Sequence, residues 1–337
     1  MARPSSYKKK LTAGLPSKLA YQETPQLITT AESNRQTSAN STLVTENVST
    51  VPDIRVFQIY YEAWQQQLLD PSFIAWDNTQ VQSELMEFEV FERLFSSAAI
   101  KKAELWGALS WRYNEKTRLT GTQLIKIIQA NPGADVYYCN PHLANEALFH
   151  NAWLQGEVSH PQLSSLCTAL FAALDWDPKE LLSIHHSSSW SSANYFVGTS
   201  VFWENYLKFV REVLTIAESK LDVSLRNLLH AKSGDAKGLH GGATYIPFII
   251  ERLFQMFLKT SGKYLKKFKI DLPERERELN VHLKILRDMK DHAYQAESQW
   301  LAACWVNYRN LYLTQFYGRA WCQRYLRLIT PTEIHFA

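Results

Sequence analysis

The stretch Ile54-Arg55-Val56-Phe57-Gln58-Ile59-Tyr60 is the first part of this 337-residue chain that predicts buried structure. It is rich in β-branched and aromatic residues, and its length suits a strand better than a helix. Residues 1–52, in contrast, are rich in Ser, Thr, Gln and Asn and hold too little clustered apolar surface to offset the entropy lost on ordering. We therefore predict a flexible leader over residues 1–52 and a folded region from residue 53 onward.

Helices and further strands alternate after this first strand. We expect strands at residues 73–78, 103–110 and 134–139, with helices between them at residues 84–96 and 120–131. The second helix carries a start signal, because Thr120 is followed three residues later by Gln123. This alternation predicts an α/β fold with a mostly parallel central sheet flanked by helices.

The remainder of the chain is expected to be mainly helical. Apolar spacing predicts helices at 143–156, 161–174, 201–219 and 247–258, and it makes residues 274–328 almost wholly helical. The glycines within residues 222–243 predict a mobile loop. We thus divide the folded part into a domain over residues 53–260 and a helical C-terminal extension, residues 261–337, packed on its core.

Composition narrows the class of protein. Lys and Arg total 36 against 33 for Asp and Glu, a formal charge of +3, which gives no general electrostatic footprint for nucleic acid. The cysteines are far apart and form no metal-binding pair, so we interpret them as reduced thiols of a cytoplasmic protein: Cys139, Cys167, Cys304 and Cys322.

We expect that the chain does not cross a membrane. No apolar run approaches the roughly 20 residues that span a bilayer, and the basic N-terminus is not followed by the apolar segment of a signal peptide. Basic and aromatic residues are interleaved near the C-terminus, which leaves open a peripheral contact with the inner face of a membrane. Packing of these aromatics within the chain's own domain is the alternative.

Polar and aromatic residues gather where the predicted strands end. Ligands of open α/β sheets bind beyond the carboxyl ends of the strands. An arginine there suits a diphosphate because its planar fork pairs phosphate oxygens bidentately, whereas aromatic faces suit a base. The alternative is that the aromatics belong to the core and that the arginine forms a surface ion pair. The nucleotide-binding or donor-binding candidates are Tyr60, Tyr61, Asp77, Asn78, Trp111, Arg112, Tyr113 and Asn140.

Several segments resemble, in order and spacing, those of a known family. Glu84-Leu85 lies in an aromatic helix and is followed by Trp106-Gly107 and Ser110-Trp111-Arg112-Tyr113. Later come Asn194-Tyr195-Phe196-Val197-Gly198 and the helix that contains Glu251-Arg252-Leu253. From about residue 54 to 258 this set resembles a family of bacterial GT-A-like glycosyltransferases from capsule and lipopolysaccharide gene clusters. The chain departs from it at Ser110-Trp111, where the family has a His-Tyr pair.

The resemblance implies a GT-A-like fold with the nucleotide over the first half of the sheet. It implies a hexosyltransferase-like enzyme that moves a sugar from a nucleotide-sugar donor to a glycan or lipid-linked glycan acceptor of the cell surface. By position, Arg112 would face the diphosphate, Asn194 the acceptor side and Glu251 the sugar. Arg252 and His240, the latter in the glycine-rich loop, are further acceptor-side candidates.

Glu251 is the candidate catalytic base, since an inverting transfer needs a carboxylate near the acceptor hydroxyl. We expect Arg252 or Arg112 to hold its pKa down. The alternative is that Glu251 pairs with a neighbouring cation on a helix surface.

The requirement for a metal stays open at this stage. GT-A enzymes commonly place an Asp-x-Asp after the fourth strand, where Mn²⁺ or Mg²⁺ offsets the charge of the diphosphate. This chain has Asn140-Pro141-His142 there, and its Asp175-Trp176-Asp177 has the pattern of a turn at a helix end. A non-catalytic glycan-binding or scaffold protein that kept the fold is therefore a second hypothesis. A nucleic-acid-binding protein is a third, against which the near-neutral charge argues.

Overall fold

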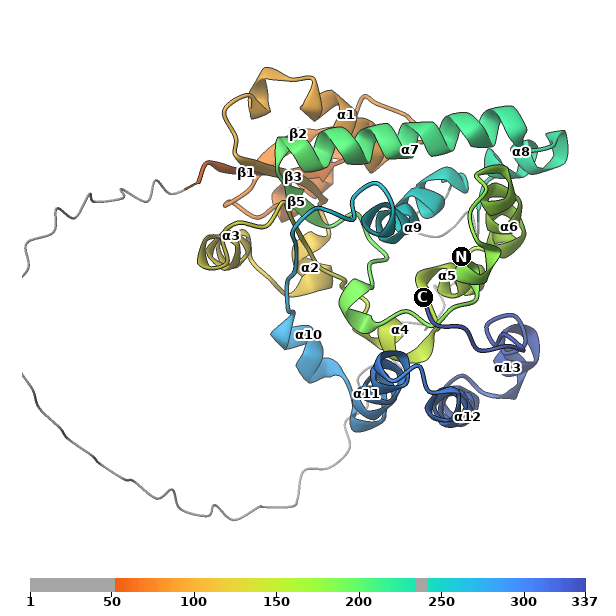
Figure 1. The fold of residues 1–337 in the computed structure, drawn as a ribbon. Coiled ribbons are helices and arrows are strands. Elements are labelled where there is room, and N and C mark those ends of the chain that lie inside the picture. Colours follow the sequence, from red (N-terminus) through yellow and green to blue (C-terminus); the bar gives the residue numbers. More distant parts are fainter. Residues whose placement is uncertain (1–51, 234–241) are drawn as a thin grey trace, which may run out of the picture. The chain divides into compact units, whose positions relative to one another are not determined.

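The computed structural model describes residues 52–233 and 242–337, so the predicted leader and residues 234–241 lie outside the described part. A six-stranded sheet stands at its centre, in the spatial order β2-β1-β3-β5-β4-β6 (Figure 1). The strands predicted around residues 54, 74, 105 and 136 are all present. The strands of the sheet are β1 (Ile54–Tyr60), β2 (Ile74–Asp77), β3 (Leu105–Ser110), β4 (Val136–Tyr138), β5 (Phe196–Gly198) and β6 (Lys267–Lys269).

The sheet is mixed, so the prediction of a mostly parallel sheet holds only in part. β1 is parallel to both β2 and β3, and β4 is parallel to β6. β5 runs antiparallel to β3 on one side and to β4 on the other. The direction of a strand follows from the path of the chain that enters it, which the residues of the strand itself do not encode.

Both faces of the sheet are buried at β1 and β3, where successive side chains point to opposite sides and nearly all are buried. Phe57 and Ile59 of β1 pack on one face in a cluster with α1 (Glu87–Phe95), α7 (Ser200–Lys220) and α9 (Ile246–Lys259). Val56 faces the other way, toward α2 (Tyr113–Thr117) and α3 (Gly121–Ala130). Figure 1 shows α7 and α9 on one side of the strands and α3 on the other.

One helix prediction and one loop prediction need correction. The single helix expected at 143–156 is two, α4 (Leu143–Leu148) and α5 (Ala152–Ser159), because Phe149 is extended and Asn151 caps α5 by accepting from the Leu154 amide. The predicted loop over residues 222–243 contains α8 (Val223–Leu229), which Asp222 caps. The capping box of Thr120 and Gln123 at the start of α3 is confirmed.

The remaining helices follow the predicted pattern. They are α6 (Leu163–Ala173), α10 (Pro273–Glu278), α11 (Val281–Gln295), α12 (Gln299–Tyr317) and α13 (Arg319–Tyr325). Short 3₁₀ helices link these elements: η1 (Ala63–Leu68), η2 (Ala98–Ile100), η3 (Pro178–Leu181) and η4 (Ser187–Ser189).

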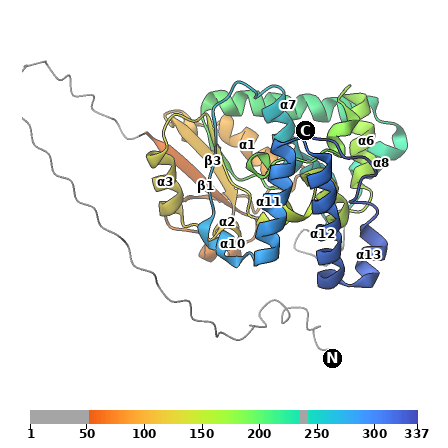
Figure 2. The same cartoon turned by 60° about the horizontal axis from the view of Figure 1, so that its bottom comes forward.

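The C-terminal residues 261–337 are helical, but they also supply β6, which the sequence pattern did not predict because it has only three residues. Figure 2 shows α11 and α12 side by side, with α13 next to α12. The indole of Trp305 is buried and donates to the Ala147 carbonyl at 2.9 Å, whereas Phe316 is 59% exposed. The aromatic stretch is thus divided between internal packing and surface. No helix in the described ranges has the length and apolarity to span a bilayer.

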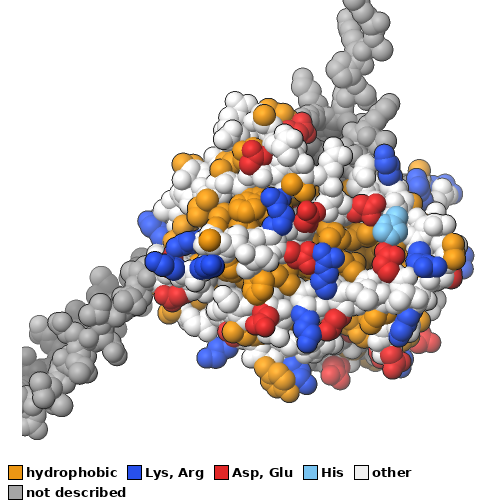
Figure 3. Space-filling model, turned by 90° about the horizontal axis from the view of Figure 1, so that it is seen from above, with side chains coloured by type: hydrophobic (Ala, Val, Ile, Leu, Met, Phe, Trp, Pro, Cys, Tyr) orange, Lys and Arg blue, Asp and Glu red, His pale blue; other side chains and the backbone are white. Residues whose placement is uncertain are grey.

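The surface is mixed in charge on the face that Figure 3 shows, where Lys and Arg side chains alternate with Asp and Glu among hydrophobic ones. All four cysteines are free thiols.

Gly107 generates the first prediction. A Cβ at this position in β3 would collide with the backbone oxygen of Phe196 in β5 and would lie 2.9 Å from Cγ2 of Val197. Since a backbone atom of a paired strand cannot yield cheaply, Gly107→Ala should lower the free energy of unfolding by about 1–3 kcal/mol in urea denaturation. Ala75→Val, at an exposed site of β2, is the control and should change it by less than about 0.5 kcal/mol. Equal stability of the two variants would contradict the tight β3–β5 contact.

Candidate active site

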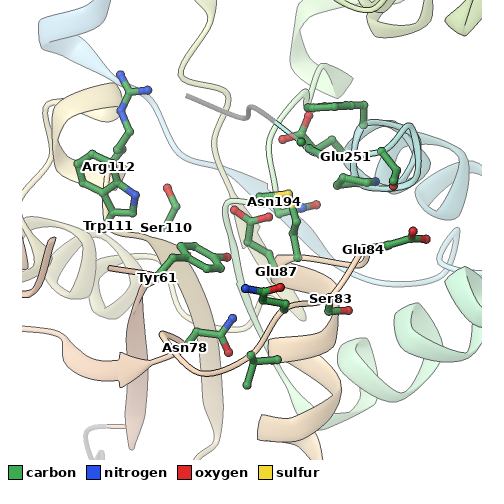
Figure 4. A pocket seen from close by; sticks show the side chains of 18 of the residues that line it. Tyr61, Asn78, Ser83, Glu84, Glu87, Ser110, Trp111, Arg112, Asn194 and Glu251 are labelled. Atoms are coloured by element: carbon green, nitrogen blue, oxygen red, sulfur yellow. The ribbon is translucent and has the colours of Figure 1, made fainter. Parts of the chain in front are cut away.

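A cavity of about 640 Å³ opens beyond the carboxyl ends of β1 and β3. Tyr61 follows β1, and Trp111 and Arg112 follow β3. Because β5 is antiparallel to β3, the residues that precede β5, Asn194 and Tyr195, lie on this same edge. Glu251, in the second turn of α9, completes the cavity opposite Arg112 (Figure 4).

The structure brings together six of the candidates that the sequence predicts. All of these residues line the one cavity: Tyr61, Asn78, Trp111, Arg112, Asn194 and Glu251. His240 belongs to the residues outside the described part.

Two of the donor candidates around β1 and β2, Tyr60 and Asp77, are not among the residues that line the cavity. Tyr60 is buried within β1, where its hydroxyl bonds to the Asp77 carboxylate. Asp77 also accepts from the backbone and hydroxyl of Thr79, which holds its pKa below the usual value. Alternation along the strand explains the result, since Tyr60 and Tyr61 point to different sides.

Tyr113 and Asn140 are also structural. Tyr113 is fully buried between the rings of Phe73 and Tyr195, so it is the core aromatic that the alternative hypothesis foresaw. Asn140 is buried; its amide nitrogen donates to Glu146 at 2.8 Å, and its oxygen accepts from the Ser192 hydroxyl at 3.0 Å.

Arg252 is a structural residue rather than an acceptor-side one. Its guanidinium donates to the carbonyl oxygens of Ala152 and Phe248 and to the side chain of Gln155. It is 2% exposed and joins α9 to α5. Facing away from the cavity, it approaches Glu251 only to 3.8 Å, which is too long for a hydrogen bond.

One end of the cavity is basic and aromatic. Arg112 donates from Nε and Nη2 to both carboxylate oxygens of Glu115, at 2.8 and 2.9 Å, so the predicted surface ion pair is present. A guanidinium has five N–H donors, so two such bonds leave capacity for an anion. The guanidinium lies 5.8 Å from the ring centroid of Trp111, which Trp64 meets edge-on.

The other end holds two carboxylates, those of Glu251 and Glu87. Burial raises the pKa of Glu251 to about 7, and the nearby Glu87 adds to the rise. Arg252 and Lys116 act in the opposite direction without prevailing, so the expectation that an arginine holds this pKa down was wrong. The physical reason is that burial of the carboxylate outweighs the charge of Arg252, which approaches it only to 3.8 Å.

Among the lining residues that the sequence analysis did not name are Glu87, Lys116 and Trp64. Burial raises the pKa of Glu87 also, and Lys116, which lines the same cavity, lowers it. An acidic residue in the first turn of a helix is ordinary, because it complements the helix dipole, so its sequence position carried no distinctive signal. The preceding residue, Met86, has a φ of 47°, a strained conformation of the kind that often occurs at functional sites.

The rim carries an acidic and histidine cluster. His230 contacts Glu84 through Nδ1 at 2.6 Å and Glu218 through Nε2 at 2.7 Å, and the hydrogen bond to Glu84 is the main reason for its raised pKa. This cluster joins the segment before α1 to α7 and α8.

The described residues contain no group of three or more His, Cys, Asp or Glu side chains arranged to hold a metal ion. Asp177 caps η3 by accepting from the Lys179 amide, and Asp175, with a φ of 56°, follows α6, so this pair forms the predicted turn at a helix end. Comparison of the chain with protein-family models, with curated proteins and with solved structures yields no match.

The raised pKa of Glu251 generates a prediction of pH-dependent stability. A folded-state pKa above the unfolded value of about 4.3 gives stability that is present below that value and is lost as the pH rises through about 7. Glu251→Gln escapes this loss. The free energy of unfolding of this variant, relative to that of the native protein, should therefore increase between pH 5 and pH 8. The increase is about 3 kcal/mol at most, and solvent that reaches the 30% exposed side chain reduces it.

Urea denaturation at several pH values measures this difference. Glu204→Gln, on the exposed side of α7, is the control and should differ from the native protein by a constant amount. A constant difference for Glu251→Gln as well would show that Glu251 titrates as a solvated carboxylate.

Proposed function

We propose that the protein is a glycosyltransferase with a GT-A-like arrangement, which moves a sugar from a nucleotide-sugar donor to a surface glycan such as capsule or lipopolysaccharide. One observation carries the proposal: a single cavity joins a basic, aromatic end at Trp111 and Arg112 to a carboxylate end at Glu87 and Glu251 (Figure 4). A nucleotide-sugar has the same polarity, with an aromatic base and a charged diphosphate at one end and a polyol at the other.

The location of the cavity supports the same assignment. It lies beyond the carboxyl ends of β1 and β3, in the first half of the sheet, where the family resemblance would put a nucleotide. Trp111 and Trp64 offer aromatic surface on which a base can stack. The Asn78 oxygen accepts from Arg93 at 2.9 Å, so its amide nitrogen is the group that would donate to ribose hydroxyls.

Glu251 suits the role of general base in the transfer. The acceptor hydroxyl oxygen would attack the anomeric carbon while its proton passes to a Glu251 carboxylate oxygen. The bond between the anomeric carbon and the diphosphate oxygen breaks, and its electron pair leaves with the nucleotide. A pKa of about 7 makes Glu251 a stronger base than an ordinary carboxylate while keeping much of it ionised at neutral pH.

Arg112 and Lys116 would stabilise the charge that develops on the departing diphosphate. Both line the cavity, and Arg112 has donors beyond those it gives to Glu115. The segment that replaces Asp-x-Asp does not fit a metal, because the Asn140 side chain is already bonded to Glu146 and Ser192. We therefore derive no step through Mn²⁺ or Mg²⁺.

A thermal-shift panel with UDP, GDP, CMP and dTDP tests the proposal. At least one nucleotide should stabilise the protein, since a ligand at 100 times its Kd contributes about 2.7 kcal/mol. Arg112→Ala should lose this shift because it removes the diphosphate contact. Glu251→Gln should keep the shift and lose at least about 10²-fold in turnover, since it keeps the shape of the site but cannot take a proton.

Arg118→Ala is the matched control for the first variant. Arg118 pairs with Glu278 and does not line the cavity, so its loss should leave the nucleotide shift intact. Full transferase activity in both Arg112→Ala and Glu251→Gln would refute the site. Absence of a shift with every nucleotide would favour the non-catalytic glycan-binding or scaffold protein.

A further inference from the structure

The carboxylate end of the cavity holds polar groups whose hydrogen-bonding capacity is unused. Asn194 is only 6% exposed, yet its side-chain oxygen has no hydrogen-bond partner within residues 52–233 and 242–337. The hydroxyl of Tyr61 is buried and equally lacks a partner in these ranges. Both residues line the cavity, and Figure 4 shows them on either side of Glu87. Buried polar atoms are normally paired, so these two indicate a ligand that completes them.

The chemistry of these groups defines what that ligand must offer. The Asn194 oxygen and the carboxylates of Glu87 and Glu251 are acceptors, and the Tyr61 hydroxyl can either accept or donate. A set dominated by acceptors is satisfied by a ligand that brings several donors at close spacing. The hydroxyl groups of a pyranose do this, because each can donate to one neighbour and accept from another.

Charge adds a second condition. Burial raises the pKa of both Glu87 and Glu251, and Glu87 adds to the rise at Glu251, so this end of the cavity already disfavours negative charge. A carboxylate on the ligand would add a third negative group beside them. Lys116 lies near enough to lower the pKa of both glutamates, but it does not cancel the effect of burial.

We propose that this end of the cavity, formed by Tyr61, Glu87, Asn194 and Glu251, binds a neutral hexose through its hydroxyl groups and rejects a sugar that carries a carboxylate. The role of that hexose as the sugar transferred, or as the sugar that accepts it, rests on the proposed function. Recognition of the hexose at this end of the cavity does not rest on the proposed function, because it is inferred from the unpaired acceptors and the two carboxylates.

Saturation-transfer NMR with a matched pair of free sugars tests the inference on the full chain. The probes are methyl α-D-glucopyranoside and the corresponding methyl glucuronide, which differ only in a carboxylate at carbon 6. The native protein should bind the neutral sugar at least about tenfold more tightly than the uronate. Equal binding of the two sugars, or failure to bind the neutral sugar, would overturn the inference.

Two variants at this end locate the selectivity. Glu87→Gln keeps the shape of the side chain and removes its charge, so the preference for the neutral sugar should fall to less than about threefold. Asn194→Ala should weaken binding of the neutral sugar by about tenfold, since it removes an acceptor. Circular dichroism checks that both variants fold.

Glu84→Gln is the matched charge control. Glu84 also lines the cavity, but it is half exposed at the rim and pairs with His230, so this variant should keep the native preference. Loss of selectivity in Glu84→Gln and its retention in Glu87→Gln would place the sugar elsewhere.

The outcome separates this inference from the proposed function. Nucleotide binding and transfer without selectivity between the two sugars would contradict this inference and leave the proposed function intact. Sugar selectivity without any nucleotide shift or transfer would sink the glycosyltransferase proposal and leave a neutral-sugar site.

Discussion

Phe254 of α9 stacks on Phe196 of β5 with ring centroids 4.7 Å apart, and the position of Glu251 depends on this contact. Phe196 also meets Phe91 of α1 at 5.9 Å. Since α1 begins with Glu87, one buried ring fixes both helices that carry the carboxylates. The two acidic groups therefore face one cavity because of the hydrophobic core beneath them.

The same segment explains the third polar group of the site. Asn194 precedes Phe196 by two residues, so the ring that anchors α1 and α9 also fixes where the amide stands. Holding carboxylates and an unpaired amide oxygen against an apolar core is unfavourable for the empty protein. Close packing in the core, such as the stacking of Trp106 on Trp203 with ring centroids 4.1 Å apart, offsets such a cost.

The sequence predicted the parts of the fold that depend on local patterns. β1 was found at its observed bounds because seven consecutive residues carry the signal, and α3 was found because Thr120 and Gln123 cap it. β6 was missed because three residues contain too little periodicity. The antiparallel entry of β5, which turns the expected parallel sheet into a mixed one, depends on long-range chain path.

The residues of the candidate site also divide into those with a recognisable sequence signal and those without one. Trp111 and Arg112 were found because they directly follow a recognisable strand, and Glu251 was found through the family resemblance. Glu87 escaped notice because an acid at a helix start is commonplace. The direction of the Glu251 pKa shift was predicted wrongly because the neighbouring charge of Arg252 was expected to prevail, whereas burial of the carboxylate in the folded chain outweighs it.

One buried cluster holds Glu87 and Glu251 in a shared, poorly solvated cavity, and titration of the carboxyl groups measures the consequence. Carbon-13 NMR of protein labelled at the glutamate side-chain carboxyl, assigned with Glu251→Gln, gives the midpoint of each group. We expect a Glu251 midpoint near 7 that moves down in Glu87→Gln, because Glu87 is one cause of the rise. A Glu251 midpoint near the ordinary value of 4.5, unmoved by Glu87→Gln, would contradict this placement of the two groups.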